Sequence, residues 1–303
     1  MTNFLMKPKI DFAFKEIMAD EKARVGFLSA ILKLNPEDIK ETTLLNTSLR
    51  KTYEDDKLGI LDVRVLMNDD TEIDIEVQLA ELSVWAERSL FYLAKMYTGQ
   101  INPGDSYNKF KKCVSISILD FELFDDTGDF YSCFHIAEDN RHTLYTDKME
   151  FHVLELPKLP KELKDDSDNI LLWAKFINAE RKEEFDMIAD KNPYIESAYQ
   201  TLQVISQDKE KRLEYEAREK AIRDHNQFLF EATQKGINEG IQIGEKRGEK
   251  RGEKRGEKRG EERINTLNAI LINSNRIDDL KRAATDKTFQ AQLIDELLPK
   301  DTM

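Results

Sequence analysis

The sequence predicts a mixed α/β sheet flanked by helices and followed by a helical C-terminal extension. Strand-like and helix-like segments alternate in the first half of the chain, an order typical of a mixed sheet. From about residue 165 the apolar residues recur with helical spacing instead. The expected strands are two within residues 58–79, then 113–124, 131–138 and 149–158, with a helix at about 81–99.

The chain begins with a helical pattern and ends with one. Apolar spacing in residues 10–34 predicts two amphipathic helices with a break near Asp20. The last 40 residues predict two or three short helices, broken at Asn273–Asn275, which we interpret as a small oligomerisation or capping unit. We therefore divide the chain into a sheet domain (1–163), a helical extension (164–235), a repeat segment (236–262) and a small helical C-terminal unit (263–303).

Composition limits the class of protein. The formal net charge of −13 argues against broad, non-specific coating of nucleic acid, although it allows a local basic groove. No apolar run approaches the roughly 20 residues that span a bilayer, and the N-terminus lacks an apolar signal segment. We expect a cytoplasmic protein without a membrane partner. Cys113 and Cys133 each lie in a strand-like segment, so we expect buried thiols rather than a disulfide or a metal site.

Glycine recurs every fourth residue from Gly236 to Gly260, and from Gly244 the unit is Gly-Glu-Lys-Arg. Each glycine in a helix costs about 0.5–1 kcal/mol relative to alanine, so a lone helix here is weak. Two interpretations stay open. The segment is either a flexible polar linker or a helix that another copy stabilises through the glycine row, and the second makes the protein a homo-oligomer.

The segment 58–79 carries the best candidate site, because it reads as a hairpin with carboxylates on it. Glu76 and Gln78 are two residues apart on the second strand and share a face. An odd loop, Asn68–Asp70, sets Asp62 opposite Glu76, whereas a two-residue loop sets Asp62 opposite Val77. With the odd loop, two carboxylates and an amide converge, a plausible site for a divalent metal with oxygen ligands.

A hairpin of this kind followed by a helix resembles the core of the PD-(D/E)XK nuclease superfamily. The matching elements are Asp62 in GILDVRV and Glu76 in IDIEVQL, with Gln78 where the superfamily usually has lysine. DFAFKEIM, DDKLGILDVRV, RSLFYLAKMY, VSISILDFELF and the glycine-punctuated charged repeat are similar to the bacterial Rpn family of recombination-promoting nucleases, also described as PD-(D/E)XK family putative transposases.

The resemblance implies a Mg²⁺- or Mn²⁺-dependent DNA endonuclease whose nuclease domain is residues 1–163. Asp62 and Glu76 would hold the metal, with the backbone carbonyl of Val77 as a further ligand, and Gln78 would complete the catalytic set. The metal would polarise the phosphate and lower the pKa of the attacking water. A neutral amide at Gln78 orients water or phosphate but supplies no charge, which puts the rate of cleavage in question.

Three further side chains are candidates for contact with DNA. Arg88 and Tyr92 lie one helical turn apart and would face the site, and Lys15 on the first helix would lie near the same groove. The alternative is that Arg88 forms a surface salt bridge and Tyr92 packs in the core. The four histidines, His135, His142, His152 and His225, show no ligand spacing, so the sequence assigns them no chemistry.

Metal-activated hydrolysis of DNA phosphodiester bonds, promoting recombination, is the function that the sequence favours. An alternative of a different class is a catalytically weak DNA-binding or assembly protein that self-associates through the repeat and the C-terminal helices. A transposase in the strict sense is less favoured, since no separate strand-transfer domain is visible in the sequence.

Overall fold

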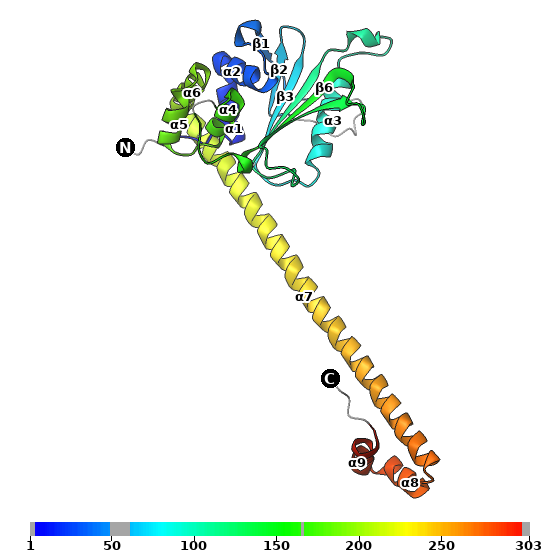
Figure 1. Ribbon diagram of the computed structural model, residues 1–303. Helices are drawn as coiled ribbons and strands as arrows, with labels where there is room; N and C mark the ends of the chain where they lie inside the picture. The colour runs from blue at the N-terminus through cyan, green and yellow to red at the C-terminus, as the bar shows by residue number, and fades with distance from the viewer. Residues whose placement is uncertain (1–3, 49–60, 165–166, 299–303) are drawn as a thin grey trace. The chain divides into compact units, whose positions relative to one another are not determined.

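The computed structural model describes residues 4–48, 61–164 and 167–298. They contain a six-stranded sheet with the strand order β1-β2-β3-β4-β6-β5 (Figure 1). The strands are β1 (Thr42–Leu44), β2 (Val63–Met67), β3 (Glu72–Gln78), β4 (Cys113–Leu119), β5 (Tyr131–Ala137) and β6 (Leu144–Glu155). β3, β4 and β6 run parallel and the other pairs are antiparallel, so the expected mixed sheet is confirmed. The short edge strand β1 was not expected from the sequence.

Six helices accompany the sheet in the first part of the chain. They are α1 (Asp11–Ala19), α2 (Glu21–Leu32), α3 (Trp85–Thr98), α4 (Asn169–Asn178), α5 (Lys182–Ala189) and α6 (Pro193–Gln207), with short 3₁₀ turns at Pro36–Asp38, Tyr107–Lys109 and Leu156–Lys158. The break at Asp20 is confirmed: its carboxylate accepts a hydrogen bond from the Ala23 amide (2.7 Å) and caps α2.

Helices cover the two faces of the sheet unequally. α1, α2 and α4–α6 bury one face in a core that includes Phe27 and Trp173, and Ile73, Ile75 and Val77 of β3 belong to this core. α3 covers the other face and contributes Trp85, Leu93 and Met96. Successive side chains of a strand alternate between faces. Glu72, Asp74 and Glu76 of β3 therefore point to the α3 side.

The β2–β3 hairpin has the odd loop that the candidate site requires. The paired residues are Val63 with Ile75, Arg64 with Asp74, Val65 with Ile73 and Leu66 with Glu72. The loop is Asn68–Asp70, and Asp70 has a φ of 65°, the left-handed conformation common at the end of three-residue hairpin loops. Of the two registers that the sequence left open, the structure has the one whose continuation sets Asp62, just before β2, opposite Glu76.

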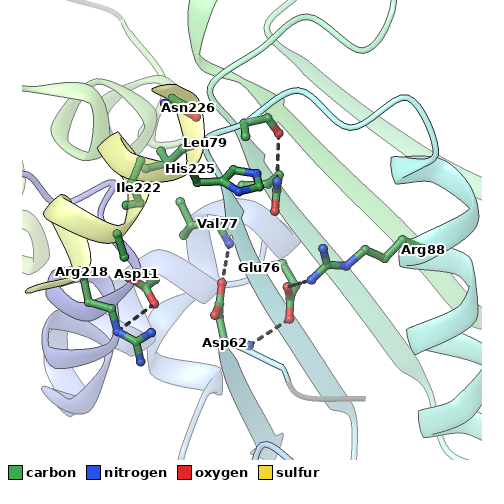
Figure 2. Close-up of a pocket in the computed structure, with 13 residues that line it drawn as sticks. Asp11, Asp62, Glu76, Val77, Leu79, Arg88, Arg218, Ile222, His225 and Asn226 are labelled. Carbon is green, nitrogen blue, oxygen red and sulfur yellow. Dashed lines mark hydrogen bonds and ion pairs between the residues drawn. The ribbon is translucent and has the colours of Figure 1, made fainter. Parts of the chain in front are cut away.

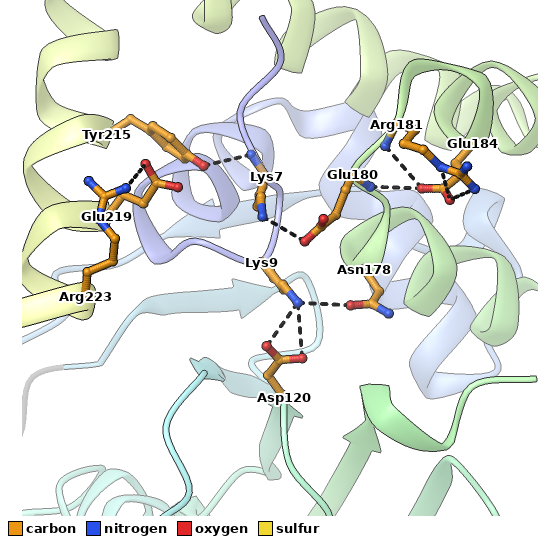
Figure 3. A network of polar contacts seen from close by, with 10 residues as sticks. All are labelled: Lys7, Lys9, Asp120, Asn178, Glu180, Arg181, Glu184, Tyr215, Glu219 and Arg223. Atoms are coloured by element: carbon orange, nitrogen blue, oxygen red, sulfur yellow. Dashed lines mark hydrogen bonds and ion pairs between the residues drawn. The ribbon is translucent and has the colours of Figure 1, made fainter. Parts of the chain in front are cut away.

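A polar network ties the N-terminal segment to α4, to β4 and to the start of α7 (Lys209–Asn273) (Figure 3). The Lys7 amide donates to the Tyr215 hydroxyl (3.2 Å), and the Lys7 ammonium group lies 2.8 Å from Glu180. Lys9 pairs with Asp120, which follows β4, at 3.0 Å. Tyr215 is itself buried in the main core, so the first turns of α7 are held on the sheet domain.

The chain forms two compact units, residues 1–226 and 227–303. In the first unit α4–α6 share one core with α1 and α2. The second unit holds the rest of α7, α8 (Ile277–Thr285) and α9 (Lys287–Leu297), whose small core is Leu267, Leu271, Ala283 and Leu293. The predicted break near Asn275 is confirmed, and the glycine repeat is helical. No helix among the described residues is both long and apolar enough to cross a bilayer.

Candidate active site

Asp62 and Glu76 meet at the end of the β2–β3 hairpin (Figure 2). The Asp62 amide donates to Glu76 Oε1 (2.9 Å), and the Val77 amide donates to Asp62 Oδ2 (3.1 Å). Each carboxylate therefore has one oxygen fixed by a backbone N–H group. This reciprocal pairing leaves Asp62 Oδ1 and Glu76 Oε2 for other partners.

The two remaining oxygens face cationic side chains. Lys15 of α1 places its Nζ 3.2 Å from Asp62 Oδ1, and Arg88 of α3 places its Nη2 3.8 Å from Glu76 Oε2. The Arg88 guanidinium also lies over the rings of Trp85 and Tyr92, at 5.4 and 5.3 Å from their centroids. These cation–π contacts help to hold the guanidinium beside the Glu76 carboxylate.

Burial, and then the neighbouring Asp62 carboxylate, raise the pKa of Glu76 to about 7. Asp74, two residues earlier on the same face, is completely buried, and neither of its carboxylate oxygens has a hydrogen-bond partner among the described residues. Burial followed by repulsion from Glu76 raises the pKa of Asp74 well above its ordinary range. Burial and mutual repulsion thus favour the protonated forms of Glu76 and Asp74, even though Lys15 and Arg88 lie beside the site.

The pKa of Glu76 predicts a pH dependence of folding in the metal-free protein. Between its ordinary value of 4.5 and about 7, folded Glu76 keeps a proton that the unfolded chain has lost. Stability therefore falls as pH rises through this window and levels off above it. We expect the Tm of the wild type, measured with a chelator, to drop more between pH 5 and pH 8 than that of Glu76→Gln; parallel curves would contradict the shift.

The other expected site residues are placed as follows. The Gln78 side-chain amide donates to the Ala80 carbonyl (2.9 Å), so its NH₂ group is already engaged. Tyr92 is half-buried, packs against the cluster that contains Leu93 and Met96, and has its ring centroid 5.3 Å from the Arg88 guanidinium. Val77 contributes its amide to Asp62, and metal ligation by its carbonyl remains a prediction.

The carboxylates line a pocket of about 370 Å³. One of its walls comes from α7, through Arg218, Ile222, His225 and Asn226, and Asp11 of α1 lies beside Arg218 (Nε to Oδ2, 3.9 Å) (Figure 2). The sequence did not assign these residues to the site. For Asp11 a signal existed, because it precedes Lys15 by four residues and so shares its helix face. For His225, 149 residues after Glu76, no local signal exists.

The donor set fits a hard divalent cation. Mg²⁺ and Mn²⁺ prefer carboxylate and carbonyl oxygens, and the two carboxylate oxygens that are not bonded to the backbone are those now paired with cations. A metal ion placed there would relieve the repulsion that raises the pKa of Glu76. Asp62 and Glu76 are therefore the residues that would hold it.

A mixed sheet with paired carboxylates on an antiparallel hairpin, followed by a helix and a parallel strand, is consistent with the PD-(D/E)XK nuclease fold. The chain belongs to the family described as PD-(D/E)XK nuclease family transposase, whose model matches residues 8–232. The match confirms the resemblance seen in the sequence and extends it through α4–α6 to the start of α7. No curated protein and no solved structure is significantly similar to the chain.

Proposed function

We propose that the protein is a Mg²⁺- or Mn²⁺-dependent DNA endonuclease. The observation that carries the proposal is the pairing of Asp62 and Glu76, with one oxygen of each fixed by the backbone and the other turned toward a cation. Membership of a nuclease family supports the reaction class. The bound metal would polarise the scissile phosphate and generate hydroxide from water near neutral pH.

Lys15 supplies the positive charge that Gln78 lacks. In this chain the usual lysine position on β3 holds an amide whose NH₂ group bonds to Ala80. The Lys15 ammonium group reaches the Asp62 carboxylate from α1 instead (3.2 Å) and is more than a third exposed, so a phosphate oxygen can approach it. We propose that Lys15 stabilises charge on the phosphate during cleavage and that Arg88 binds the DNA backbone.

The direct test is cleavage of supercoiled plasmid by the purified full-length chain with Mg²⁺, with Mn²⁺ and with a chelator. The proposal expects nicked product only with a metal. Cleavage of the same rate in the chelator would show that these carboxylates do not hold a required ion. If the endonuclease activity is present, the DNA breaks that it makes would promote recombination. A separate strand-transfer step is not needed to start it.

A second candidate is a DNA-binding assembly protein with little catalytic activity. Its support is that Lys15 and Arg88 already neutralise the carboxylates, which leaves less need for a metal. The two candidates differ in metal binding. If Mg²⁺ and Mn²⁺ leave the Tm unchanged while DNA still binds tightly, the second candidate is favoured.

We also propose that the repeat segment brings copies of the chain together. The seven glycines lie on a continuous helix, and beyond the adjoining residues and backbone of that helix a Cβ added at any of them meets no described atom within 4 Å. A row of glycines four residues apart lets a second helix approach closely, and the Glu and Lys/Arg rows offer it complementary charge.

Replacing Gly244, Gly248, Gly252 and Gly256 with alanine is expected to lower the oligomeric mass measured by light scattering. Alanine favours the lone helix by about 0.5–1 kcal/mol per site but blocks close approach. A variant with alanine at Gln234 and Asn238, both exposed on the same helix, controls for the change in helix propensity. An unchanged mass in the glycine variant would leave the helix as a spacer only.

A further inference from the structure

A second cluster of metal-ligating side chains lies on β5 and β6, away from the candidate active site. Antiparallel pairing sets Cys133 opposite His152 and His135 opposite Glu150. Residues two apart on a strand share a face, so all four side chains project to one side of the sheet. The cluster is not evident along the chain, because its two pairs, Cys133 with His135 and Glu150 with His152, come from strands whose ligands are 15–19 residues apart.

The cluster and the candidate active site lie on opposite faces of the sheet. The parallel registers set Ile75 of β3 beside Ile116 of β4, and Ile116 beside His152 of β6. His152 therefore shares its face with Ile75, while Glu76, the next residue, points to the other face. A metal ion at the cluster would be separate from one held by Asp62 and Glu76.

The distances within the cluster suit a small coordination sphere. His152 Nε2 lies 2.7 Å and Cys133 Sγ lies 3.8 Å from the same oxygen, Glu150 Oε1. One ligand atom from each of these three residues lies within 4.8 Å of the others. Ligands of a tetrahedral zinc ion with bonds of about 2.0–2.3 Å are themselves roughly 3.4–3.7 Å apart. Small rotations of side chains would therefore close the cluster around an ion.

His135 lies beside the three residues, outside the group whose ligand atoms are all within 4.8 Å of one another, and would supply a fourth ligand after a change of its rotamer. Its Nδ1 lies 4.0 Å from Cys133 Sγ and its Nε2 lies 3.5 Å from Glu150 Oε2. Lys112 forms an ion pair with Glu150 through that second oxygen, Oε2. Glu150 Oε1, which faces the cysteine and the buried histidine, is thus free of the lysine and available as a ligand.

The buried histidine is held from both of its ring nitrogens. His152 is 2% exposed, and its Nε2 lies 2.7 Å from Glu150 Oε1, the oxygen that also faces Cys133. Its other nitrogen, Nδ1, lies 2.8 Å from the Tyr131 hydroxyl. A metal-bound histidine commonly donates its second ring N–H to such an oxygen, which fixes the tautomer and the orientation of the ring.

We propose that Cys133, His135, Glu150 and His152 form a zinc site that clips the edge strand β5 to β6. A thiolate, two imidazoles and one carboxylate are a donor set typical of Zn²⁺ and unsuited to Mg²⁺. β5 is the outermost strand of the sheet, and a register shift interrupts its pairing with β6 just after His135. Zinc would hold the strand pair at the point where backbone pairing becomes irregular.

The test measures zinc binding by the full-length, metal-stripped Glu76→Gln protein, in competition with a chromophoric chelator. The Glu76→Gln background removes the other candidate metal site. We expect one equivalent of Zn²⁺, a rise in Tm on binding, and a thiolate-to-metal absorption band when Co²⁺ replaces Zn²⁺. Cys133→Ser should abolish that band and weaken Zn²⁺ binding at least about a hundredfold, and Tyr131→Phe should weaken binding about tenfold.

Two matched variants serve as controls. Cys113→Ala removes the other thiol and His142→Ala removes an exposed histidine outside the cluster, and neither should change the affinity. Because His152 is buried, His152→Gln is informative only if the variant folds. Cys133 is exposed, so Cys133→Ser is expected to fold and is the variant that decides the test. Absence of Zn²⁺ binding, or equal affinity in the parent and Cys133→Ser proteins, would overturn the proposal.

Discussion

Replacing Asp62 with Asn, or Glu76 with Gln, is expected to lower metal-dependent DNA cleavage by at least about a thousandfold. Each replacement keeps the oxygen that accepts the backbone hydrogen bond, so the hairpin keeps its geometry. What is lost is the negative charge that holds the metal. Metal ions supply several kcal/mol of transition-state stabilisation, and each 1.36 kcal/mol is tenfold in rate.

The measurement is the rate of nicking of supercoiled plasmid in Mg²⁺, together with the Tm shift that Mg²⁺ produces. Asp70→Asn is the matched control, because Asp70 lies on the same hairpin, is exposed and has a left-handed φ that asparagine tolerates. It should cleave like the wild type. If Asp62→Asn nicks DNA at the wild-type rate, the assignment of the site is wrong.

Replacing Lys15 with Met is expected to lower the rate of cleavage at saturating DNA by about a hundredfold. Methionine keeps much of the length of the side chain but removes the ammonium group beside Asp62. Loss of one donor that stabilises transition-state charge typically costs about 10²–10³ in rate. Because the role proposed for Lys15 is in the reaction itself, DNA affinity should fall by much less than the rate.

Single-turnover cleavage and fluorescence anisotropy of labelled DNA separate these two quantities. Lys22→Met, an exposed lysine on the next helix, removes the same charge from the same end of the chain and should leave both unchanged. Lys15→Arg retains the charge and should recover part of the rate. Equal losses of rate and affinity in Lys15→Met would make Lys15 a DNA-binding residue only, and no loss would remove it from the site.

The β2–β3 hairpin shows which features of the site can be predicted from the sequence alone. Alternation in IDIEVQL placed Glu76 and Gln78 on one face, and the loop Asn68–Asp70 fixed the register that brings Asp62 to Glu76. Both are local properties, because side-chain direction in a strand follows from position and register follows from the length of the turn. The same holds for the helix break at Asp20, where a short polar side chain caps the next helix.

Not all contacts between segments far apart in the chain could be predicted from the sequence. The resemblance placed Lys15 and Arg88 near the site, where their ion pairs with Asp62 and Glu76 lie. Nothing near Gln78 in the sequence indicates that Arg218 and His225 of α7 line the same pocket. The histidines illustrate the point most clearly. Read along the chain they show no ligand spacing, yet the β5–β6 register brings His135 and His152 to one cluster with Cys133.

Cys133 is also where the expectation from the sequence was wrong. Its apolar neighbours predicted a buried thiol, which is correct for Cys113 but not for Cys133, an exposed residue of an edge strand. Burial depends on the position of a strand within the sheet, and an edge strand can have the same composition as a central one.

The sequence alone therefore predicted the family, the mixed sheet, the candidate carboxylates and the helices on either side of the glycine repeat. Each of these depends on periodicity, turn length or a short motif, which are properties of neighbouring residues. Only the tertiary structure decided which carboxylate each cation pairs with, that α7 lines the pocket and that Cys133, Glu150 and His152 lie together. Those contacts join residues far apart in the chain. They form only when the sheet has assembled and the helices have packed against it.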